Sequence, residues 1–513
     1  MLADRPWLYV MRDSDYEFYA QLLPRDHPLL DALELIPWDS FTPLLRPYYS
    51  LNHGQPAIDP LLMLKLEFLR YFCRLSDREV ISRCQTDVVY RYFLQVPVFL
   101  KMPASTSLVN FRGRLGVDGF QKVFDHLITI AREMGLVRDR LRLKDATHII
   151  AKIAVPHTLK LFAQLREKLH ASIKVIAPVV AEGFQIDIQR VQAESVKADD
   201  EIRLQQRVEL VQEMHGWLVE QLQSSDRNPT IDWQKVEDLC QLASKILGDT
   251  LQKGKGDRTL SVVDPEARRS KHGGWYDGYS MDLMMDADSE LITAVDVLVA
   301  GGDEAQSALN LVKTEQQAQG NHVEAVSIDG VGFNGPMLRE FEDPEGLAVT
   351  VYTPPRKPSD ANVLSVAEFQ LSETGDHVTC PAGHQSSTRQ RDKARHRSYF
   401  QFARKTCEGC PLMSQCQPVL GKGVYGGRGV TKNDYEAEHQ RMRARAKTEQ
   451  YAAVRSEHPA VERKLNEVVN HHDARHAKYW GHDKVKKQAL MTCMAVDLKR
   501  MLRLRRGVSA PAW

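Results

Sequence analysis

The sequence predicts an α/β protein in which a mixed-sheet domain follows an all-α N-terminal domain. Three observations indicate this class. Apolar residues recur at helical spacing through residues 1–135. Around position 145, and again from Trp275 onward, the pattern changes to the alternation and short apolar runs that are typical of strands. A long polar stretch of helical pattern, residues 156–256, separates the two groups of strands and indicates an insertion.

The composition is that of an ordinary globular protein. The chain has 513 residues, of which 43% are apolar and 26% are charged, and this length is enough for about two to four domains. No run approaches the roughly 18 apolar residues that a membrane span requires, and the start MLADRPWLYV lacks the layout of a signal peptide. We therefore expect a cytoplasmic protein without a membrane partner, whose eight cysteines are reduced.

The net charge of +1 conceals a marked asymmetry along the chain. From Pro381 onward there are 27 Lys and Arg against 12 Asp and Glu, whereas the first 380 residues hold 41 basic and 55 acidic residues. Lys and Arg that contact phosphates release condensed counterions, so a basic C-terminal part favours binding to a polyanion such as DNA. A solvated charged surface is the alternative, and charge alone does not separate the two.

Residues 1–135 are predicted to form a helical DNA-binding domain. Pro60 opens the apolar helix LLMLKLEFLRYFCRL, and Ser76 with a Glu three residues later is a capping box for the next helix. A later helical stretch carries Arg112 and Arg114, which we expect to contact DNA. Short helices with tight breaks suit a reader of the helix-turn-helix kind, although a plain helical bundle fits the pattern equally well.

The insertion, residues 156–256, is predicted to be an antiparallel helical hairpin or a small bundle. Its segments LFAQLREKLHASIKVI, EIRLQQRVELVQEMHGWLVEQLQ and WQKVEDLCQLASKIL have helical spacing. We interpret it as a spacer without chemistry. The stretch that follows, GKGDRTLSVVDPEARRSKHGG, is predicted to be a loop.

The remaining elements complete a mixed sheet. The segment GYSMDLMMDADSELITAVDVLVA breaks at DADSE and predicts a β-hairpin. A helix, a strand that ends on Asp329, a short helix and the strand LAVTVYTPP follow. With the strand around Asp145 placed first, the order is β, insertion, β-β, α, β, α, β and then a helix that carries Glu462. This is the element order of the RNase H-like fold. We assign its core to residues 136–155 and 257–375, completed by the helices of 431–513.

Three acidic residues in separate elements are the candidate catalytic site. Asp145 lies in LRLKDATHII, Asp329 in VEAVSIDGVGFNG and Glu462 in HPAVERKLNEVVNHH. Enzymes that cut and join phosphodiesters use carboxylates from separate elements to hold two divalent cations, here Mg²⁺ or Mn²⁺. Asp145 and Asp329 could instead be turn residues, and Glu462 has rivals in Glu457 and Glu467.

Four cysteines are candidate zinc ligands in a Cys-rich lobe, residues 376–430. A C-x2-C pair with flanking cysteines matches tetrahedral thiolate ligation, and His384 is a substitute ligand. Free buried thiols, or a lobe that no longer takes up metal, are the alternatives. The expected zinc ligands are Cys380, Cys407, Cys410 and Cys416.

Basic residues accompany the predicted site. The stretch RQRDKARHRSYFQFARK mixes Arg395 and Arg397 with aromatic residues, which suits unpaired bases and strand ends. A solvated loop is the alternative. Positive charge also brackets Glu462, as a site that attracts phosphates requires. The residues there that we expect to contact DNA are Arg455, Lys464, Arg475 and Lys478.

Several of these segments resemble bacterial insertion-sequence transposases of the DDE type, over roughly residues 45 to 505. The resemblance rests on HGQPAIDPLLMLKLEFLRYF, LRLKDATHI, GYSMDLMMDADSELITAVDV, VSIDGVGFNG and, above all, VERKLNEVVNHHDARHAKYWGHDKVKKQALMTCMAVDLKRML. It implies that Asp145, Asp329 and Glu462 are the catalytic triad. Members of this family often carry a cysteine cluster between the second Asp and the Glu, which implies a structural role for it here.

The resemblance implies an enzyme that binds terminal inverted repeats and catalyses Mg²⁺-dependent strand cleavage and strand transfer. Its partners would be transposon-end DNA and target DNA, with a homodimer on the DNA. A catalytically inactive DNA-binding regulator and a metal-dependent nuclease of the same fold are the alternatives. One departure stands out: Val469 occupies the position where related transposases carry a Lys, so Lys464 or Arg475 is expected to contact the phosphate instead.

Overall fold

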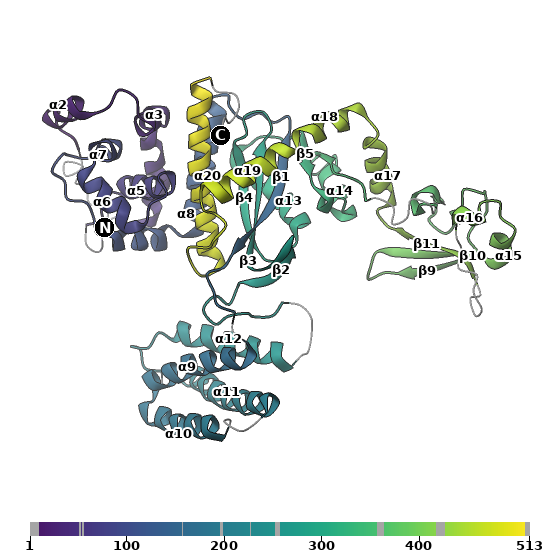
Figure 1. Cartoon of the computed structure of the whole chain (residues 1–513), viewed down its shortest axis with the longest axis horizontal. Helices are drawn as coiled ribbons and strands as arrows, with labels where there is room; N and C mark the ends of the chain where they lie inside the picture. The colour runs from purple at the N-terminus through teal and green to yellow at the C-terminus, as the bar shows by residue number, and fades with distance from the viewer. Residues whose placement is uncertain are drawn as a thin grey trace.

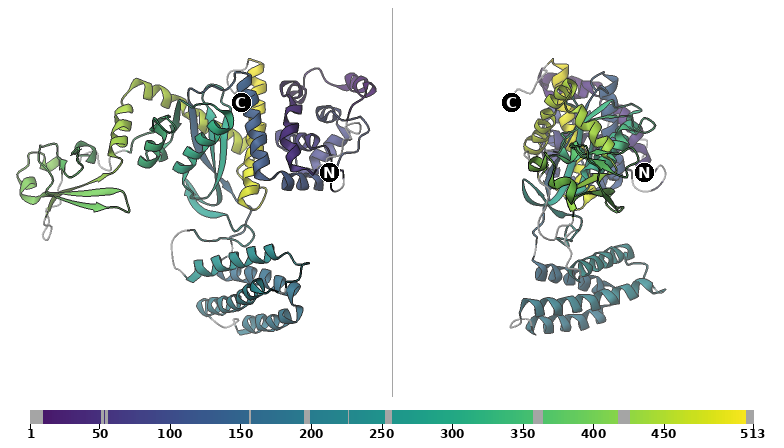
Figure 2. Two further views of the ribbon diagram at one scale, coloured as in Figure 1. Left: turned by 180° about the vertical axis from the view of Figure 1, so that it is seen from behind. Right: turned by 90° about the vertical axis from the view of Figure 1, so that its right-hand side faces the viewer.

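A mixed sheet stands at the centre of the computed structural model, and three groups of elements extend from it (Figure 1). The N-terminal helices lie on one side, a helical insertion lies below, and a small β-lobe lies on the far side (Figure 2). Parts of the predicted domains, residues 1–9 and 508–513 among them, lie outside the described residues. The structure describes residues 10–50, 53, 56–155, 157–194, 199–225, 227–251, 257–356, 364–416 and 426–507.

The N-terminal region is helical, as predicted. The capping box begins α6 where the sequence placed it, since Ser76 Oγ accepts from the N–H of Glu79 at 3.2 Å and Glu79 Oε2 accepts from the N–H of Ser76 at 2.7 Å. The helices are α2 (Asp13–Leu22), α3 (Pro28–Leu35), α4 (Thr42–Leu45), α5 (Pro60–Phe72), α6 (Asp77–Thr86), α7 (Val88–Leu94) and α8 (Ser105–Glu133).

Six strands form the central sheet. In it β3 pairs antiparallel with β1 on one side and with β2 and β4 on the other, while β1 pairs parallel with β5, and β5 parallel with β6. The strands are β1 (Arg142–Ile150), β2 (Arg268–His272), β3 (Gly274–Asp286), β4 (Ile292–Val299), β5 (Ala325–Ile328) and β6 (Thr350–Tyr352).

Strand β2 corrects the prediction of a loop before Trp275. Its sequence, RRSKH, has no apolar alternation, so nothing local indicates a strand. It forms because β3 is long and offers an open edge: Arg268 pairs with Gly278, and His272 pairs with Gly274. Backbone pairing to a neighbour, and not side-chain pattern, determines this element.

Helices cover both faces of the sheet. Helix α13 (Glu304–Gln319) packs on β3 and β4, and α19 (Pro459–Asn466) packs on β1. Helix α20 (His482–Arg505) runs beside α8 and contacts both β4 and α5 (Figure 1). The N-terminal helices, the sheet and α20 therefore share one continuous core, which extends from Leu29 to Leu502. The other helices near the sheet are α14 (Gly335–Glu342), α17 (Glu436–Arg445) and α18 (Glu449–Glu457).

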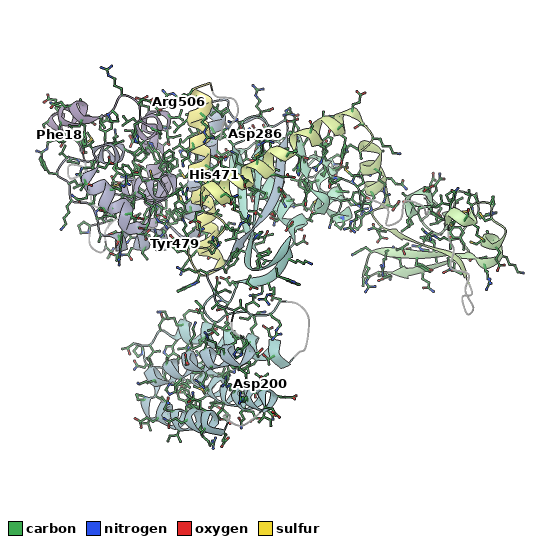
Figure 3. The ribbon with its side chains drawn as sticks, viewed as in Figure 1. Phe18, Asp200, Asp286, His471, Tyr479 and Arg506 are labelled. Atoms are coloured by element: carbon green, nitrogen blue, oxygen red, sulfur yellow. The ribbon has the colours of Figure 1, made fainter. Side chains whose placement is uncertain are left out.

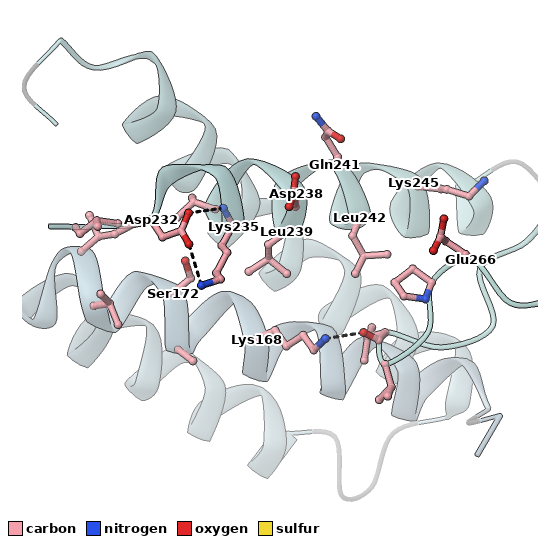
Figure 4. A pocket seen from close by; sticks show the side chains of 18 of the residues that line it. Lys168, Ser172, Asp232, Lys235, Asp238, Leu239, Gln241, Leu242, Lys245 and Glu266 are labelled. Atoms are coloured by element: carbon pink, nitrogen blue, oxygen red, sulfur yellow. Dashed lines mark hydrogen bonds and ion pairs between the residues drawn. The ribbon is translucent and has the colours of Figure 1, made fainter. Parts of the chain in front are cut away.

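The insertion is a bundle with its own apolar core, and the pattern had not separated its second helix. Its helices are α9 (Thr158–Ile176), α10 (Pro178–Glu194), α11 (Asp200–Gln223) and α12 (Trp233–Leu251). A groove of about 1070 Å³ opens between α9 and α12, lined largely by apolar side chains such as Leu239 and Leu242 (Figure 4). It is formed by the insertion and the segment that follows it, so it is separate from the predicted catalytic carboxylates.

The Cys-rich lobe, whose described elements run from β7 to β11, contains a small sheet. The stretch predicted to present aromatic residues forms a β-hairpin in which Phe400 and Phe402 are buried in a core with Phe369, while Tyr399 is partly exposed. Only one of the three rings is therefore available to a base. The elements are β7 (Gln370–Leu371), β8 (Val378–Thr379), β9 (Thr388–Asp392), β10 (Arg397–Ala403), α15 (Arg404–Glu408), α16 (Met413–Cys416) and β11 (Gly426–Asn433).

A buried ion network fastens α13 to the sheet. The guanidinium of Arg142 on β1 is fully buried and pairs with Asp286 at 3.0 Å and with Glu315 of α13 at 2.6 Å. Asp286 lies at the end of β3 (Figure 3). Burial raises the pKa of Asp286, and Arg142 opposes that rise. Among the described residues, no helix is long and apolar enough to span a membrane.

The variant Arg142→Met should destabilise the sheet by about 3–5 kcal/mol, because two carboxylates would remain buried without their cation. Urea unfolding monitored by intrinsic fluorescence measures the change. Arg140→Met is the matched control, since its guanidinium is 45% exposed and pairs with Asp288 and Glu457 near the surface. It should cost about 1 kcal/mol or less. Equal losses in the two variants would contradict the role assigned to the network.

Candidate active site

Asp145 and Asp329 lie on neighbouring parallel strands. The last paired residues of β1 and β5 are Lys144 and Ile328, and each acid is the residue that follows. Adjacent strands are separated by about 4.8 Å, so the pairing register alone brings the two carboxylates together. The predicted pair is therefore formed by strands that are far apart in sequence and adjacent in the sheet.

The third predicted acid, Glu462, lies in the first turn of α19. Pro459 occupies the first position of this helix, where the absence of an N–H costs nothing. The helix packs its apolar side on β1, with Val461 and Leu465 buried, and Glu462 is exposed. No described residue forms a hydrogen bond or an ion pair with its carboxylate.

The two rivals of Glu462 are occupied elsewhere. Glu457 accepts two hydrogen bonds from Arg140, at 3.0 and 2.8 Å. Glu467 is buried and pairs with Lys464 at 2.7 Å. Glu462 is thus the member of this group whose charge remains available to the aspartates.

Asp145 lies within electrostatic reach of both Asp329 and Glu462. The pKa of Asp145 is raised to about 6, chiefly by burial, and further by the negative charges of Asp329 and Glu462. A hydrogen bond from the N–H of Ala146 to Asp145 Oδ1, at 2.8 Å, acts in the opposite direction. Like charges held this close favour any cation that enters between them.

Both aspartates also make the local bonds that turn residues make. Asp145 Oδ1 accepts from the next N–H along the chain, and Asp329 Oδ1 accepts from the N–H of Val331 at 3.2 Å. Asp329 precedes a single 3₁₀ turn, Gly330–Gly332, and its carbonyl oxygen accepts from Thr353 Oγ1 at 2.6 Å. These bonds fix the backbone beside each carboxylate and do not exclude a catalytic role.

Arg455 lies beside the acids and is itself held by β5. Its guanidinium donates to Ser327 Oγ at 3.0 Å and to the carbonyl oxygen of Ile328 at 2.9 Å. Burial lowers its pKa, while Asp329, Glu462 and Asp145 raise it. Arg455 therefore partly neutralises the negative charge of the three carboxylates when no other cation is present.

Two positioning residues were not predicted from the sequence. Ser327 Oγ lies 3.1 Å from Nδ1 of His458, the buried residue that separates α18 from α19. Burial, and then the charge of Arg455, lower the pKa of His458 to about 4, so its ring is neutral and Nδ1 can accept from the serine hydroxyl. The chain Arg455–Ser327–His458 fixes the start of the Glu462 helix beside Asp329. The sequence offered only the His-Pro pair before VERK as a signal.

The three predicted Mg²⁺ ligands, Asp145, Asp329 and Glu462, do not form a complete metal site on their own. In the described parts of the chain, no group of three or more His, Cys, Asp or Glu side chains is arranged to hold a metal ion. Mg²⁺ retains several waters and uses substrate phosphates as ligands, so an incomplete carboxylate set is compatible with it.

The four cysteines line one small space in the Cys-rich lobe, although the described side chains there are not arranged as a metal site. Cys380, Cys407, Cys410 and Cys416 line it together with His384. Its volume is about 20 Å³, which is enough for one water-sized particle. Burial raises the pKa of Cys416, Arg428 opposes that rise, and the other three thiols add to it.

The predicted DNA-contacting residues divide into three groups. Arg112 is only 8% exposed and pairs with Glu67 at 2.9 Å and with Asp77, and Lys464 is buried against Glu467, so both stabilise the interior. Arg455 and Arg475 are half-buried beside the sheet. The residues that reach the surface at least in part are Arg114, Arg395, Arg397 and Lys478.

Arg475 lies on the same face of β1 as Asp145. It donates to Thr147 Oγ1 at 3.1 Å and to the carbonyl oxygen of His148 at 2.6 Å. Residues 145 and 147 point to the same side of the strand, because side chains alternate. The Arg475 guanidinium therefore lies on the face of β1 that carries Asp145, at the position two residues further along the strand.

Comparison with known families gives two matches. Residues 17–114 match a family described as "Transposase domain (DUF772)", and residues 379–502 match a family described as "Transposase DDE domain". The first covers the N-terminal helices as far as part of α8, and the second covers the cysteine lobe and the helices that include Glu462. A search of curated proteins finds no match to the chain.

The raised pKa of Asp145 predicts a pH-dependent stability in the absence of divalent cations. Because the folded protein holds this proton more tightly than the unfolded chain, stability falls as pH rises from about 4 through 6. The variant Asp145→Asn should therefore have a higher melting temperature than the wild type at pH 8 and an equal one at pH 4, measured by differential scanning fluorimetry with EDTA.

Asp288→Asn is the control of opposite sign for that experiment. Hydrogen bonds from Arg140 lower the pKa of Asp288, so its carboxylate stabilises the fold at pH 8. Its removal should lower the melting temperature there. A destabilised Asp145→Asn protein at pH 8 would contradict the crowding of charges at the candidate site.

Proposed function

Since this chain is an insertion-sequence transposase of the DDE type, we propose that it binds the terminal inverted repeats of a bacterial insertion sequence and catalyses Mg²⁺-dependent strand cleavage and strand transfer. The observation that carries the proposal is that β1, which carries Asp145, is paired in register with the strand that precedes Asp329 and that the charges of Asp329 and of Glu462, on α19, both raise the pKa of Asp145. The enzyme would act on DNA in the bacterial cytoplasm.

The order of the strands supports an RNase H-like catalytic core. Reading across the sheet from β4, the order is β4-β3-β1-β5-β6. The pairs β4–β3 and β3–β1 are antiparallel, whereas the pairs β1–β5 and β5–β6 are parallel. In chain order, without the edge strand β2, this is 3-2-1-4-5. The first and fourth strands are then neighbours, as they are in the RNase H-like fold.

The carboxylates suit a hard divalent cation. Oxygen ligands are those that Mg²⁺ and Mn²⁺ take, and mutual repulsion among the three acids favours their neutralisation by metal. When bound, two such ions would activate the attacking oxygen and stabilise the leaving oxygen of an in-line displacement. Asp145 and Asp329 would hold both ions, and Glu462 would hold one.

The remaining side chains of the site orient the acids and the substrate. Arg455 reduces the repulsion among the carboxylates and is itself fixed by Ser327 and Ile328. His458 stays neutral, so it adds no charge that would compete with a cation. Arg475, on the same face of β1 as Asp145, is suited to bind a phosphate next to the one that reacts.

The proposed partners are transposon-end DNA and target DNA. Arg114, Arg395, Arg397 and Lys478 support contacts with phosphates because they reach the surface at least in part. Arg112 and Lys464 support the fold instead, since acidic partners inside the protein hold their charges. Two ends of an element must be joined in one reaction, so we propose a homodimer on the DNA.

We also propose that the Cys-rich lobe binds a structural Zn²⁺. Four thiols line a space that is large enough for one small ion or water molecule. His384 lines the same space and is the substitute ligand. Burial, and to a smaller extent the neighbouring thiols, raise the pKa of Cys416, and a bound Zn²⁺ would offset that rise by stabilising the thiolate.

Replacing either aspartate with asparagine should abolish Mg²⁺-dependent cleavage of a labelled terminal-repeat duplex and leave its binding intact. Loss of a metal ligand should lower the cleavage rate by about a thousandfold or more. Gel electrophoresis of products, with Mg²⁺ and then with EDTA, measures the rate for Asp145→Asn, Asp329→Asn and Glu462→Gln. Glu457→Gln is the matched control, because Arg140 holds that carboxylate on the outer side of α18.

The same assay separates the alternatives. A wild-type protein that binds the ends but never cuts them would be a transposase-derived regulator, and one that cuts without producing joined strands would be a nuclease of the same fold. Cleavage by Asp145→Asn at the wild-type rate would refute the catalytic assignment.

Protein purified without chelators should contain about one zinc per chain. Mass spectrometry of the metal content should show this zinc lost in Cys407→Ser and retained in Cys493→Ser, a buried cysteine of α20 that is remote from the lobe. Protein that is fully folded and free of zinc would overturn the proposal.

A further inference from the structure

A basic cavity lies where the N-terminal helices meet the segment that leads into α20. Its volume is about 470 Å³, and Arg70, Arg74, Arg78, Lys478 and Tyr479 line it. Figure 3 places Tyr479 between the N-terminal helices and the foot of α20. Neither the candidate active site nor the family matches assign a role to this cavity.

Part of its charge is neutralised within the protein. Arg70 pairs with Asp77 at 2.7 Å and with Glu67 at 3.1 Å, and Arg112 pairs with the same two acids from the other side. These two cations and two anions balance one another. The negative charge of Asp77 is therefore not available to neutralise Arg74 and Arg78.

Three cations of the cavity remain poorly neutralised. Within the described part of the chain, neither Arg74 nor Arg78 makes a side-chain hydrogen bond or an ion pair, and both are exposed. Lys478 pairs with Asp473 at 3.5 Å, and its Nζ lies 5.8 Å from the centre of the Tyr71 ring. Burial lowers the pKa of Lys478, and the nearby charges of Arg70 and Arg74 lower it further against the effect of Asp473.

The end of α5 fixes the backbone of Arg74 beside the cavity. Its φ is +58°, the left-handed conformation that ends a helix. The N–H of Leu75 then donates to the carbonyl oxygen of Arg70 at 2.8 Å, which completes the helix end.

The start of α6 contributes further donors. The capping box uses the N–H groups of Ser76 and Glu79. The N–H groups of Asp77 and Arg78 have no acceptor among the described residues, and they stand at the positive end of the helix dipole. Paired N–H groups at a helix start, beside arginines, form an anion site.

We propose that this cavity binds a phosphate of the DNA backbone, with Arg74, Arg78 and Lys478 as its cationic donors. The inference rests on the proposed function, because DNA is the polyanion that a transposase must hold. It adds a defined contact on the N-terminal helices, to which the sequence assigned only Arg112 and Arg114.

The path from the active site to the cavity is continuous. The N–H of Ile150, at the end of β1, donates to the carbonyl oxygen of Arg475 at 2.8 Å, and the N–H of Ala477 donates back to Ile150 at 2.9 Å. The segment that carries Lys478 is thus paired with the end of β1 and lies beside that strand. Ile150 is about 17 Å along β1 from Asp145, so β1 connects the candidate site to the segment that lines the cavity.

The test measures DNA affinity of the full chain by fluorescence anisotropy in EDTA, so that cleavage does not contribute. Two labelled duplexes are compared, one with the terminal repeat and one with a scrambled sequence. Arg74→Ala and Arg78→Ala should each weaken binding to both duplexes by the same factor, about three- to tenfold, because a phosphate contact carries no sequence information. The slope of log affinity against log salt should become shallower by about 0.9 for each phosphate that the variant no longer neutralises.

Arg83→Ala is the matched control. It removes an exposed arginine from α6, the helix that carries Arg78, at the end of the helix away from the cavity. The DNA affinity and the salt slope should therefore be unchanged. Melting curves establish that all variants are folded. If Arg74→Ala fails to fold, Arg74→Gly, which relieves the left-handed backbone, carries the test.

A second measurement locates the contact on the DNA. Duplexes that carry a single neutral methylphosphonate are scanned along the end, and one position should weaken the wild type but not Arg78→Ala. Wild-type affinity and salt slope in both arginine variants would overturn the cavity assignment while leaving the proposed function intact. A wild type that binds neither duplex would instead overturn the proposed function.

Discussion

The burial of one carboxylate, Asp145, beside the negative charges of Asp329 and Glu462 is the constraint on which the candidate site depends. Asp145 and Asp329 have no freedom to separate, because each follows the last paired residue of two neighbouring parallel strands. Burial, and to a smaller extent the charges of Asp329 and Glu462, raise the pKa of Asp145. Arg455 partly neutralises these charges from within the protein, and its own position is fixed by hydrogen bonds to β5. A site that is costly when empty of cations is one that a divalent cation stabilises.

The third acid depends on packing and not on strand pairing. Helix α19 presents Glu462 because Val461 and Leu465 are buried against the sheet and because His458 fixes the helix start to Ser327. Helix α20 then packs against α8 and β4 and joins the sheet to the N-terminal helices through a single core. The N-terminal helices are therefore held in one orientation relative to the carboxylates. DNA bound to those helices would enter the site along a fixed direction.

The basic residues illustrate why charge in a sequence is a weak guide to DNA contacts. Arg112 and Arg114 are two residues apart on one helix, so they point in different directions. Arg112 is buried between Glu67 and Asp77, whereas Arg114 is exposed and lies over the ring of Tyr49. Lys464, two residues after Glu462, is likewise enclosed by Glu467. Arg74 and Arg78, which no pattern distinguished, are left without acidic partners because the neighbouring acids already hold Arg70 and Arg112.

The sequence by itself determined the helical N-terminal region, the capping box at Ser76 and the hairpin after Trp275, because local spacing and side-chain chemistry record each of these. It also indicated Asp145, Asp329 and Glu462 as the candidate site, and that assignment stays a prediction. The sequence did not predict β2, since that strand exists only by pairing with the open edge of β3. It also could not choose among Glu457, Glu462 and Glu467, nor separate buried cations from exposed ones. Only tertiary structure decided these points, because the partner that neutralises a charge comes from a distant part of the chain.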